Sequence, residues 1–199
     1  TAYEISTRDW SSDVCSSDLD AATSALTFNK RYAVAVAGMG GVPVSRSVLL
    51  FKDQFKGAGD IIAGLKFPVF VKPNNGGSSI GMSKVDAPDE TLEPAIQKAF
   101  REDSQVLVEE MIVGREFTVG VFRSGGEIIV LPLTEVKAHA EKAFFDFEAK
   151  YQGKSTETTP AEVEETIANM IREMARKVDR KSTRLNSSHE WISRMPSSA

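Results

Sequence analysis

The sequence predicts an α+β fold with a mostly antiparallel sheet. Several short runs rich in Val, Ile and Phe follow one another with only polar turns between them, which is typical of neighbouring antiparallel strands. The dipeptide Gly125-Gly126 between two of these runs is a hairpin turn signal. Two longer segments, residues 92–100 and 163–178, instead space their apolar side chains like one face of a helix.

The first expected element is a helix over residues 24–37. Ser24 is a suitable N-cap, and glycines at positions 38, 40 and 41 follow the expected end of the helix. An extended stretch runs over residues 43–50, where Pro43 disfavours a helix. Residues 60–66 are ambiguous, because their pattern fits neither a helix nor a strand.

The remaining elements alternate strands with two helices. Strands are expected at residues 69–71, 80–85, 106–111, 117–122 and 127–133. Pro94 is tolerated in the first turn of the helix over residues 92–100. A polar loop over residues 140–159 leads to Thr159-Pro160-Ala161-Glu162, which fits a capping box at the start of the last helix. The apolar stripe of that helix is predicted to be core, and it consists of Val163, Ile167, Met170, Ile171, Met174 and Val178.

The most informative segment is the loop over residues 74–79, Asn-Asn-Gly-Gly-Ser-Ser, which follows a strand that carries Lys72. Glycines leave backbone N–H groups unshielded, and a run of them can wrap an anion. The serine hydroxyls add donors, and Lys72 adds a positive charge at the root of the loop. These features indicate a phosphate-binding loop, although not a P-loop, because the lysine precedes the glycines. A hairpin with a Gly/Ser turn explains the same residues equally well.

Acidic residues gather around the next pair of strands, at Glu109, Glu110 and Glu116. A carboxylate at a strand end suits the two hydroxyls of a ribose, because it only accepts hydrogen bonds. A solvated strand edge is the alternative interpretation, and for Glu110 alone it is the preferred one.

A third block, FFDFEAKY at residues 144–151, combines aromatic rings with charges. Lys150 is a candidate second cation for a phosphate, and the Tyr151 hydroxyl is a candidate for orienting a substrate. Taken alone, such an aromatic cluster is more often packing than chemistry.

Six blocks in this order resemble the D-alanine–D-alanine ligase family of the ATP-grasp superfamily, over about residues 22–178. The blocks are SALTFNK, GVPVSRSVLL, VKPNNGGSSIGMSKV, EEMIVGREFTV, LPLTEV and FFDFEAKY. The resemblance implies an ATP-grasp fold, with a central subdomain at residues 22–104 and part of a C-terminal subdomain at residues 105–179. It also implies an ATP-dependent ligase that joins two D-alanines through an acyl phosphate, for peptidoglycan precursor synthesis.

The resemblance assigns the phosphate end of the site to residues in and around the loop. Lys30 and Lys72 are expected to contact the ATP phosphates. Gly77, Ser78 and Ser79 are expected to cover these phosphates, with Ser78 also facing the substrate.

At the other end of the nucleotide, Glu109, Ile112 and the main chain of Glu110 are expected on the adenine side. Glu116 is expected to take the ribose hydroxyls. In many relatives a lysine stands at the position of Glu110, so its charge is not expected to matter.

The resemblance further assigns Lys150 to the γ-phosphate and Tyr151 to the placement of D-alanine near Ser78. Ser78, Lys150 and Tyr151 are therefore the expected catalytic residues. Phe145 and Phe147 replace tyrosines that are common in that loop of the family, which removes two hydroxyls and keeps the packing.

The family also uses Mg²⁺, held by Asp, Glu and Asn ligands that follow the last helix, where a catalytic arginine lies as well. We expect this chain to lack those residues and the family's N-terminal domain, and therefore to be inactive as written. The intact parent enzyme is expected to be a cytoplasmic homodimer that binds ATP and D-alanine. A D-alanyl-D-lactate ligase, another ATP-grasp carboxylate–amine ligase, and a non-catalytic nucleotide-binding fragment remain as alternatives.

Composition narrows the function classes. A net charge of −4 and a pI of about 5.4 argue against a nucleic-acid-binding surface. The one cysteine, Cys15, cannot form an internal disulfide, which suggests a reducing compartment. No apolar run is long enough for a membrane span. His139 and His189 stand alone, so no metal site is predicted among the residues present.

Two Ser-rich segments, residues 9–19 and 180–199, lack hydrophobic periodicity. Both resemble translated sequencing-adapter read-through, and native disordered tails are the alternative. We therefore expect residues 1–21 to be an artefactual or unplaced segment and residues 180–199 to be an artefactual tail.

Overall fold

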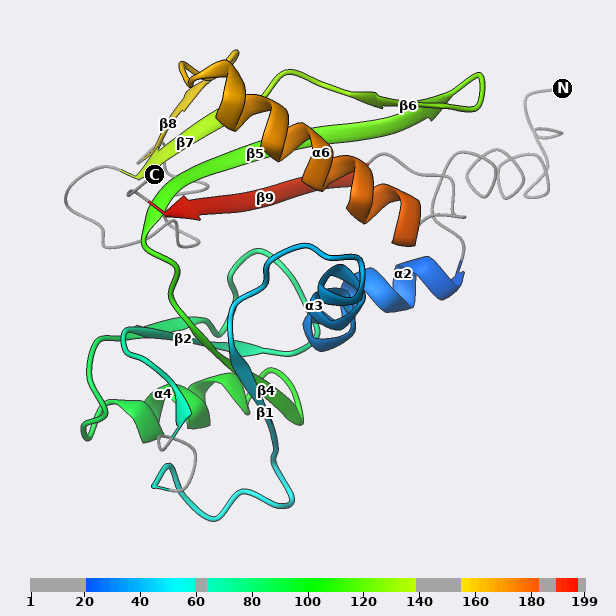
Figure 1. Ribbon diagram of the computed structural model, residues 1–199. Coiled ribbons are helices and arrows are strands. Elements are labelled where there is room, and N and C mark those ends of the chain that lie inside the picture. The colour runs from blue at the N-terminus through cyan, green and yellow to red at the C-terminus, as the bar shows by residue number, and fades with distance from the viewer. Residues whose placement is uncertain (1–20, 60–63, 139–154, 183–188, 197–199) are drawn as a thin grey trace, which may run out of the picture.

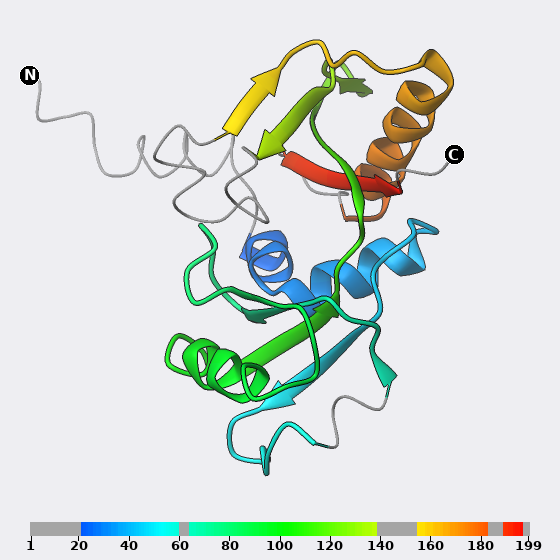
Figure 2. The same cartoon turned by 90° about the vertical axis from the view of Figure 1, so that its left-hand side faces the viewer.

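The computed structural model describes residues 21–59, 64–138, 155–182 and 189–196. Within this part of the chain the strands form two antiparallel sheets, which lie one above the other in Figure 1. Two helices near the N-terminus, α2 (Ala21–Phe28) and α3 (Lys30–Met39), lie between the sheets in both views (Figures 1 and 2). The predicted α+β class with antiparallel pairing is confirmed.

The first sheet has the strand order β1-β4-β2-β3. Its strands are β1 (Ser47–Phe51), β2 (Val69–Pro73), β3 (Ser83–Val85) and β4 (Gln105–Glu110). Helix α4 (Leu92–Ala99) covers one face, as the green helix in Figure 2 shows. The core between helix and sheet is built mainly from β-branched strand residues and small or branched helix residues, among them Val69, Val71, Val106, Val108, Leu92, Ile96 and Ala99.

The opposite face of this sheet carries the polar residues of interest. Side chains alternate along a strand, so Phe70 and Lys72 of β2 point away from the core valines on either side of them. The register places Phe70 opposite Glu109 and Lys72 opposite Leu107 on β4. Lys72 and Glu109 are therefore diagonal neighbours on one face, within reach of each other.

The second sheet is organised around the long strand β5 (Gly114–Ser124). Strands β6 (Glu127–Val130) and β7 (Thr134–Ala138) pair with it, β8 (Ser155–Thr158) pairs with β7, and β9 (His189–Pro196) also pairs with β5. Helix α6 (Glu165–Ser182) packs on β5 and β6. Phe117 and Val119 of β5 meet Ile171 of α6 in a second core, and all three are fully buried.

The prediction of a single helix over residues 24–37 is wrong. The structure has two helices, separated at Asn29, and Ser24 lies inside the first of them. Asn29 is extended, with φ −93° and ψ 109°, and its side chain accepts the backbone N–H of Tyr32. Asn29 also forms a β-bridge with Asn75. A capping side chain inside an otherwise helical pattern therefore ends one helix and begins the next.

The expected capping box at residues 159–162 is also wrong, because α6 begins only at Glu165. The backbone N–H of Ala161 donates to the Leu133 carbonyl at 2.8 Å instead. This bond ties the segment to the sheet before the helix starts. The predicted stripe is confirmed for the buried Ile171 and for Val163 and Ile167, which pack half-buried against the same core. Met170 is instead 40% exposed, and the other buried positions of the helix face are Ala168 and Ala175.

Three strands lie where none is expected from the sequence. Strand β7 occupies residues between the strand predicted over 127–133 and the loop predicted over 140–159. Strand β8 lies at the end of the polar loop predicted over residues 140–159, most of which is outside the described residues. Strand β9 lies in the tail of residues 180–199, for which the sequence predicts no place in the fold, and it pairs with β5 from Gly114 to Val121. The other strands and α4 lie within a few residues of their predicted ranges.

The turn at Gly125-Gly126 is the predicted hairpin turn between β5 and β6. Both glycines have positive φ, 58° and 86°, as this type of two-residue turn requires. None of the described helices has the length and apolar character that crossing a membrane would require.

Truncation of Ile171 tests the second core. We expect Ile171→Ala to lower the free energy of unfolding by about 2–5 kcal/mol, because it leaves a cavity beneath β5. Met170→Ala, one residue away on the exposed side of α6, is expected to change it by less than about 0.5 kcal/mol. Urea unfolding of both variants measures the two effects. Equal losses would show that the helix packs with a different face.

Candidate functional site

Lys72 and Glu109 form an ion pair on the sheet face that points away from α4. The Lys72 Nζ atom lies 2.5 Å from the Glu109 Oε1 atom, and each side chain is 19% exposed. The ammonium group also lies 5.6 Å from the centre of the Phe70 ring, within range of a cation–π contact. The lysine is thus held in a fixed place, because both of its neighbours on this face attract a positive charge.

Lys30 reaches the same place from α3. Its backbone N–H donates to the Asn74 carbonyl, and its Nζ donates to the Gly76 carbonyl, each at 2.9 Å. Burial lowers the pKa of Lys30, and the positive charge of Lys72 lowers it further, whereas Asp103 and Glu109 oppose this shift. Two lysines that are 42 positions apart in the sequence therefore meet at the root of one loop.

The loop itself, residues 74–82, joins β2 to β3. These strands pair from Val69–Val85 to Val71–Ser83, so the predicted hairpin exists and the Gly/Ser segment is its long connection. Gly76 has φ 105°, and a Cβ atom added at Gly76 or Gly77 would meet nothing within 4 Å. The loop backbone there is open to an approaching group.

Two serines of the loop adopt a backbone conformation that side chains other than glycine rarely take. Ser78 has φ 52° and Ser79 has φ 58°, both in the left-handed region. Such residues cost on the order of 1 kcal/mol each and are concentrated at ligand-binding sites. Turns with left-handed residues direct successive backbone N–H groups to one side, which favours an anion.

Asn74 was not predicted as a site residue, yet it is fully buried at 0% exposure. Its side-chain oxygen accepts the backbone N–H of Arg31 at 2.9 Å, and its amide nitrogen donates to the Gln105 side chain at 2.8 Å. Its backbone groups bond to Lys30 and Gln105. Asn74 therefore joins α3, β2 and β4 at one point. A buried asparagine cannot be recognised from a sequence in which neighbouring loop positions are also polar.

The residues assigned to the adenine side lie at the end of β4. Glu110 accepts the backbone N–H of Lys66 at 2.8 Å through Oε1, and its own backbone N–H donates to the Arg46 carbonyl at 2.9 Å. Its carbonyl accepts the Ser45 hydroxyl. Ile112 is half-buried in the connection from β4 to β5. The roles of both residues, and of Glu109 on this side, remain predictions.

Glu116, the expected ribose residue, is half-buried on β5. It alternates with the buried Phe117, so its side chain leaves the sheet on the face away from the α6 core. Lys150 and Tyr151, with Phe145 and Phe147, lie outside the described residues.

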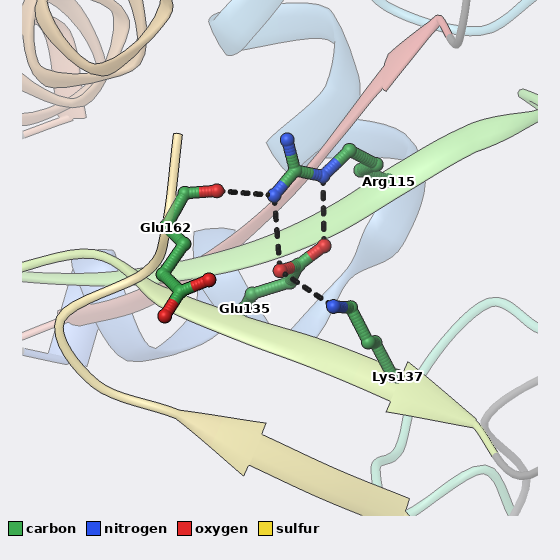
Figure 3. A network of polar contacts seen from close by, with 4 residues as sticks. All are labelled: Arg115, Glu135, Lys137 and Glu162. Carbon is green, nitrogen blue, oxygen red and sulfur yellow. Dashed lines mark hydrogen bonds and ion pairs between the residues drawn. The ribbon is translucent and has the colours of Figure 1, made fainter. Parts of the chain in front are cut away.

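A network that sequence analysis missed lies around the buried Glu135 (Figure 3), which stands opposite Phe117 on the neighbouring strand. Arg115 donates to both carboxylate oxygens of Glu135, from Nε at 2.7 Å and from Nη2 at 3.0 Å. The same Nη2 donates to the Glu162 carbonyl at 2.7 Å, and Lys137 lies 3.2 Å from Glu135. The network therefore ties β5 and β7 to the segment that leads into α6.

The hydrogen bonds and charges of this network shift the pKa values of its Glu135 and Arg115 side chains. The hydrogen bonds from Arg115 lower the pKa of Glu135, and Lys137 lowers it further, although burial opposes both. The bond to Glu135 in turn raises the pKa of Arg115. Glu135 is 3% exposed, so a buried carboxylate here depends on these partners.

Comparison with known proteins identifies the family of the chain. The sequence model of the family described as "D-ala D-ala ligase C-terminus" matches residues 37–183, which is most of the chain. The chain belongs to the D-alanine–D-alanine ligase family.

Individual relatives agree with this assignment. The chain is 43% identical to the D-alanine–D-alanine ligase of Flavobacterium psychrophilum over 155 residues, which are 78% of this chain and 46% of that protein. It is 41% identical to the D-alanine–D-alanine ligase of Flavobacterium johnsoniae over 161 residues, 81% of this chain and 49% of that protein. The chain thus spans about half the length of the curated relatives it matches.

Solved structures of the family share the fold. The VanG D-Ala:D-Ser ligase of Enterococcus faecalis matches with a TM-score of 0.78 and 30% identity over 89% of this chain and 51% of that chain. The D-alanine–D-alanine ligase of Bacillus anthracis matches with a TM-score of 0.71 over 87% of this chain and 54% of that chain; at 24% identity this likeness concerns the fold. The ATP-grasp fold predicted from the sequence is confirmed.

The donors at the loop fit the phosphates of a nucleotide. Two ammonium groups and an open glycine-containing backbone provide the charge and the N–H groups that phosphate oxygens accept. In the described ranges no three His, Cys, Asp or Glu side chains gather as they would around a metal ion.

The Glu135 network predicts an acid-sensitive stability in this member of the ligase family. Arg115→Gln leaves Glu135 with weaker partners and is expected to lower the free energy of unfolding at pH 7 by about 1–3 kcal/mol. Because the folded-state pKa of Glu135 is depressed, this contribution is present above the ordinary glutamate pKa of about 4.3 and is lost as pH falls through the folded-state value.

The difference between wild type and Arg115→Gln should therefore shrink below about pH 4, as measured by urea unfolding at several pH values. Arg172→Gln is the control, because its partner Glu165 is 73% exposed and such a pair contributes little. A loss that stays constant down to about pH 2 would contradict the assignment.

Proposed function

We propose that this protein is the ligase that joins two D-alanines at the expense of ATP, for peptidoglycan precursor synthesis. The observation that carries the proposal is the convergence of Lys30 and Lys72 on an open Gly/Ser loop, in a chain of the D-alanine–D-alanine ligase family. Named relatives with about 40% identity support the same substrate.

The reaction that this site supports has two steps. The carboxylate of the first D-alanine attacks the γ-phosphorus of ATP, the bond to ADP breaks, and an acyl phosphate forms. The amine of the second D-alanine then attacks the acyl carbon, loses a proton and expels inorganic phosphate. Phosphoryl transfer depends on alignment and on neutralising charge rather than on covalent help from the protein. In this proposal, Lys30 and Lys72 neutralise the charge of the phosphates.

Glu109 has a specific part in this proposal. A lysine without a partner on the sheet face would adopt many rotamers, and the loss of this conformational entropy would oppose nucleotide binding. The ion pair with Glu109 holds the ammonium group of Lys72 beside the loop before a phosphate arrives. The Oε1 atom of Glu109 is occupied by Lys72. A contact with adenine would therefore use the Oε2 atom, or the Glu109 side chain would have to move away from Lys72.

The other assigned residues complete the proposal. Gly77, Ser78 and Ser79 cover the phosphates, and Ser78 also faces D-alanine. Ile112 and the main chain of Glu110 contact adenine, and Glu116 binds the ribose. Lys150 reaches the γ-phosphate, and Tyr151 helps to place D-alanine. Family membership implies that ATP and Mg²⁺ take part, and we propose that the parent enzyme is a cytoplasmic homodimer.

The alternative function is a ligase that joins D-alanine to a second substrate other than D-alanine, and one comparison supports it. The matching structure with 30% identity is that of a D-Ala:D-Ser ligase. D-Serine and D-lactate are close to D-alanine in size, so the fold alone does not separate them.

The substrate is tested by ADP release from a version of the protein that spans the full length of its relatives. We expect turnover with ATP, Mg²⁺ and D-alanine alone. D-Serine and D-lactate, each added with D-alanine, are the competing arms. Turnover that requires either of them, or an L-amino acid, would contradict the proposal. Nucleotide binding by the 199-residue chain without turnover in the full-length protein would favour a non-catalytic nucleotide-binding role.

Replacement of the phosphate lysine should weaken nucleotide binding more than replacement of Glu110. Lys72→Ala removes a charge-assisted bond of about 1.5–3 kcal/mol to phosphate and leaves Glu109 as an unpaired negative charge nearby. The dissociation constant should therefore rise at least about tenfold. Glu110→Ala keeps the main chain and removes a side chain that bonds to Lys66.

Calorimetric titration of both variants with a non-hydrolysable ATP analogue measures the two effects. Equal losses would refute the assignment of Lys72 to the phosphates.

A further inference from the structure

We propose that Asp103 is a positioning residue for the phosphate loop. Acting through Asn75 and Asn29, it fixes the root of the loop and the first turn of α3, and so sets where Lys30 and the loop backbone meet a phosphate. This inference rests on the proposed nucleotide binding, and neither sequence patterns nor family resemblance assigned Asp103 a role.

The first step is the contact between Asp103 and Asn75. Asp103 lies in the turn from α4 to β4, and its Oδ2 atom accepts the backbone N–H of Asn75 at 2.7 Å and the Asn75 side-chain amide at 2.8 Å. Its Oδ1 atom accepts the backbone N–H of Gln105 at 3.2 Å. One carboxylate thus fixes both the main chain and the side chain of the residue that precedes Gly76.

The second step passes from Asn75 to α3. Because the Asn75 amide nitrogen donates to Asp103, its oxygen is turned toward Asn29, whose amide nitrogen donates to it at 3.0 Å. The Asn29 oxygen in turn accepts the backbone N–H of Tyr32 at 3.0 Å and so caps α3. The carboxylate therefore determines the direction of the whole relay, since it can only accept hydrogen bonds.

The third step connects the relay to the candidate phosphate ligands. Lys30 follows Asn29 directly, and Gly76 follows Asn75 directly. The Lys30 Nζ atom donates to the Gly76 carbonyl at 2.9 Å. A shift of either asparagine would thus displace the lysine or the loop backbone.

Residues at the end of α4 and in the turn that follows it also hold the C-terminal end of the loop, near Met82. Lys98, near the end of α4, donates to the Met82 carbonyl at 3.0 Å and lies 3.3 Å from the Ser83 hydroxyl. A Cβ atom on Gly81 would lie 2.7 Å from Glu102 Cγ, so the loop packs closely on this turn. Both ends of the loop are anchored on residues 98–103, while the middle at Gly76 and Gly77 stays open.

Charge gives Asp103 a second effect that a purely structural residue would not have. Burial and the charge of Lys72 on β2 lower the pKa of Lys30, and the negative charges of Asp103 and of Glu109 on β4 counteract them. A phosphate needs Lys30 protonated, so binding weakens as pH rises through the folded-state pKa of Lys30. Without the Asp103 charge, that loss should occur at a lower pH.

The test compares Asp103→Asn with Asp86→Asn in the 199-residue chain. Asp86 is a matched control, because it is an aspartate that directly follows β3 of the same sheet but is 75% exposed and forms only an ion pair with Lys84 among the contacts of the described residues. For Asp103→Asn we expect the dissociation constant of a non-hydrolysable ATP analogue to rise about tenfold, and the alkaline loss of binding to begin at a lower pH than in wild type. The control should bind as wild type does at every pH. Equal binding by wild type and Asp103→Asn would overturn the proposal.

A double-mutant cycle shows whether the effect passes through Asn75. The double variant should lose less binding free energy than the sum of the two single losses, because Asn75→Ala has already broken the relay on which Asp103 acts. Fully additive losses would show that Asp103 acts by another route and would overturn the proposed relay.

Hydrogen exchange without nucleotide separates this inference from the proposed function. Asp103→Asn should speed exchange of the amides of Asn75 to Gly77 at least about fivefold, while the core strand β4 stays protected. Failure of the wild-type chain to bind the nucleotide would contradict the proposed function, whereas unchanged exchange in Asp103→Asn would contradict the positioning role.

Discussion

The structure of the candidate site depends on the burial of one asparagine side chain. Asn74 is inaccessible to solvent, and a polar group in such a place costs several kcal/mol unless it is hydrogen-bonded. It bonds to Arg31 on α3 and to Gln105 on β4, while its own backbone extends β2. These three elements are distant in sequence, and the requirement to satisfy one amide holds them in a single arrangement. The loop and Lys30 take their positions from that arrangement.

The two sheets use charge in different ways. On the first sheet, the Lys72–Glu109 pair is partly exposed on a face that points away from the valine core, so its lysine is accessible to a ligand. On the second sheet, Glu135 is buried and receives two hydrogen bonds from Arg115 (Figure 3). A buried carboxylate with several partners fixes strands rather than binding a mobile ligand, because releasing a partner would leave the charge unsatisfied. The first pair belongs to the site, and the second supports the strand that carries Glu116.

Strand β9 shows that a segment without a strand-like side-chain pattern can pair with the edge of a sheet. Its residues belong to a Ser-rich tail without hydrophobic periodicity, yet they pair with β5 from Gly114 to Val121. Pairing of this kind is made by backbone groups, which every residue except proline supplies in full. A strand edge with unpaired N–H and C=O groups accepts such a segment through backbone pairing alone.

The sequence by itself determined the antiparallel α+β class, the strands on both sides of the Gly/Ser loop, the Gly125-Gly126 turn and the family. These features depend on local patterns, namely the spacing of apolar residues, the residues of the turns and the order of the motifs, which can be recognised from residues close together in the sequence. The tertiary structure alone decided that Asn29 divides the first helix, that α6 begins at Glu165, and that Asn74, Asp103 and Glu135 have partners inside the fold. Each of these depends on a bond between residues that are distant in the sequence or on a carbonyl of another strand. Such bonds exist only after packing has excluded water from the polar groups involved, because until then water satisfies those groups equally well.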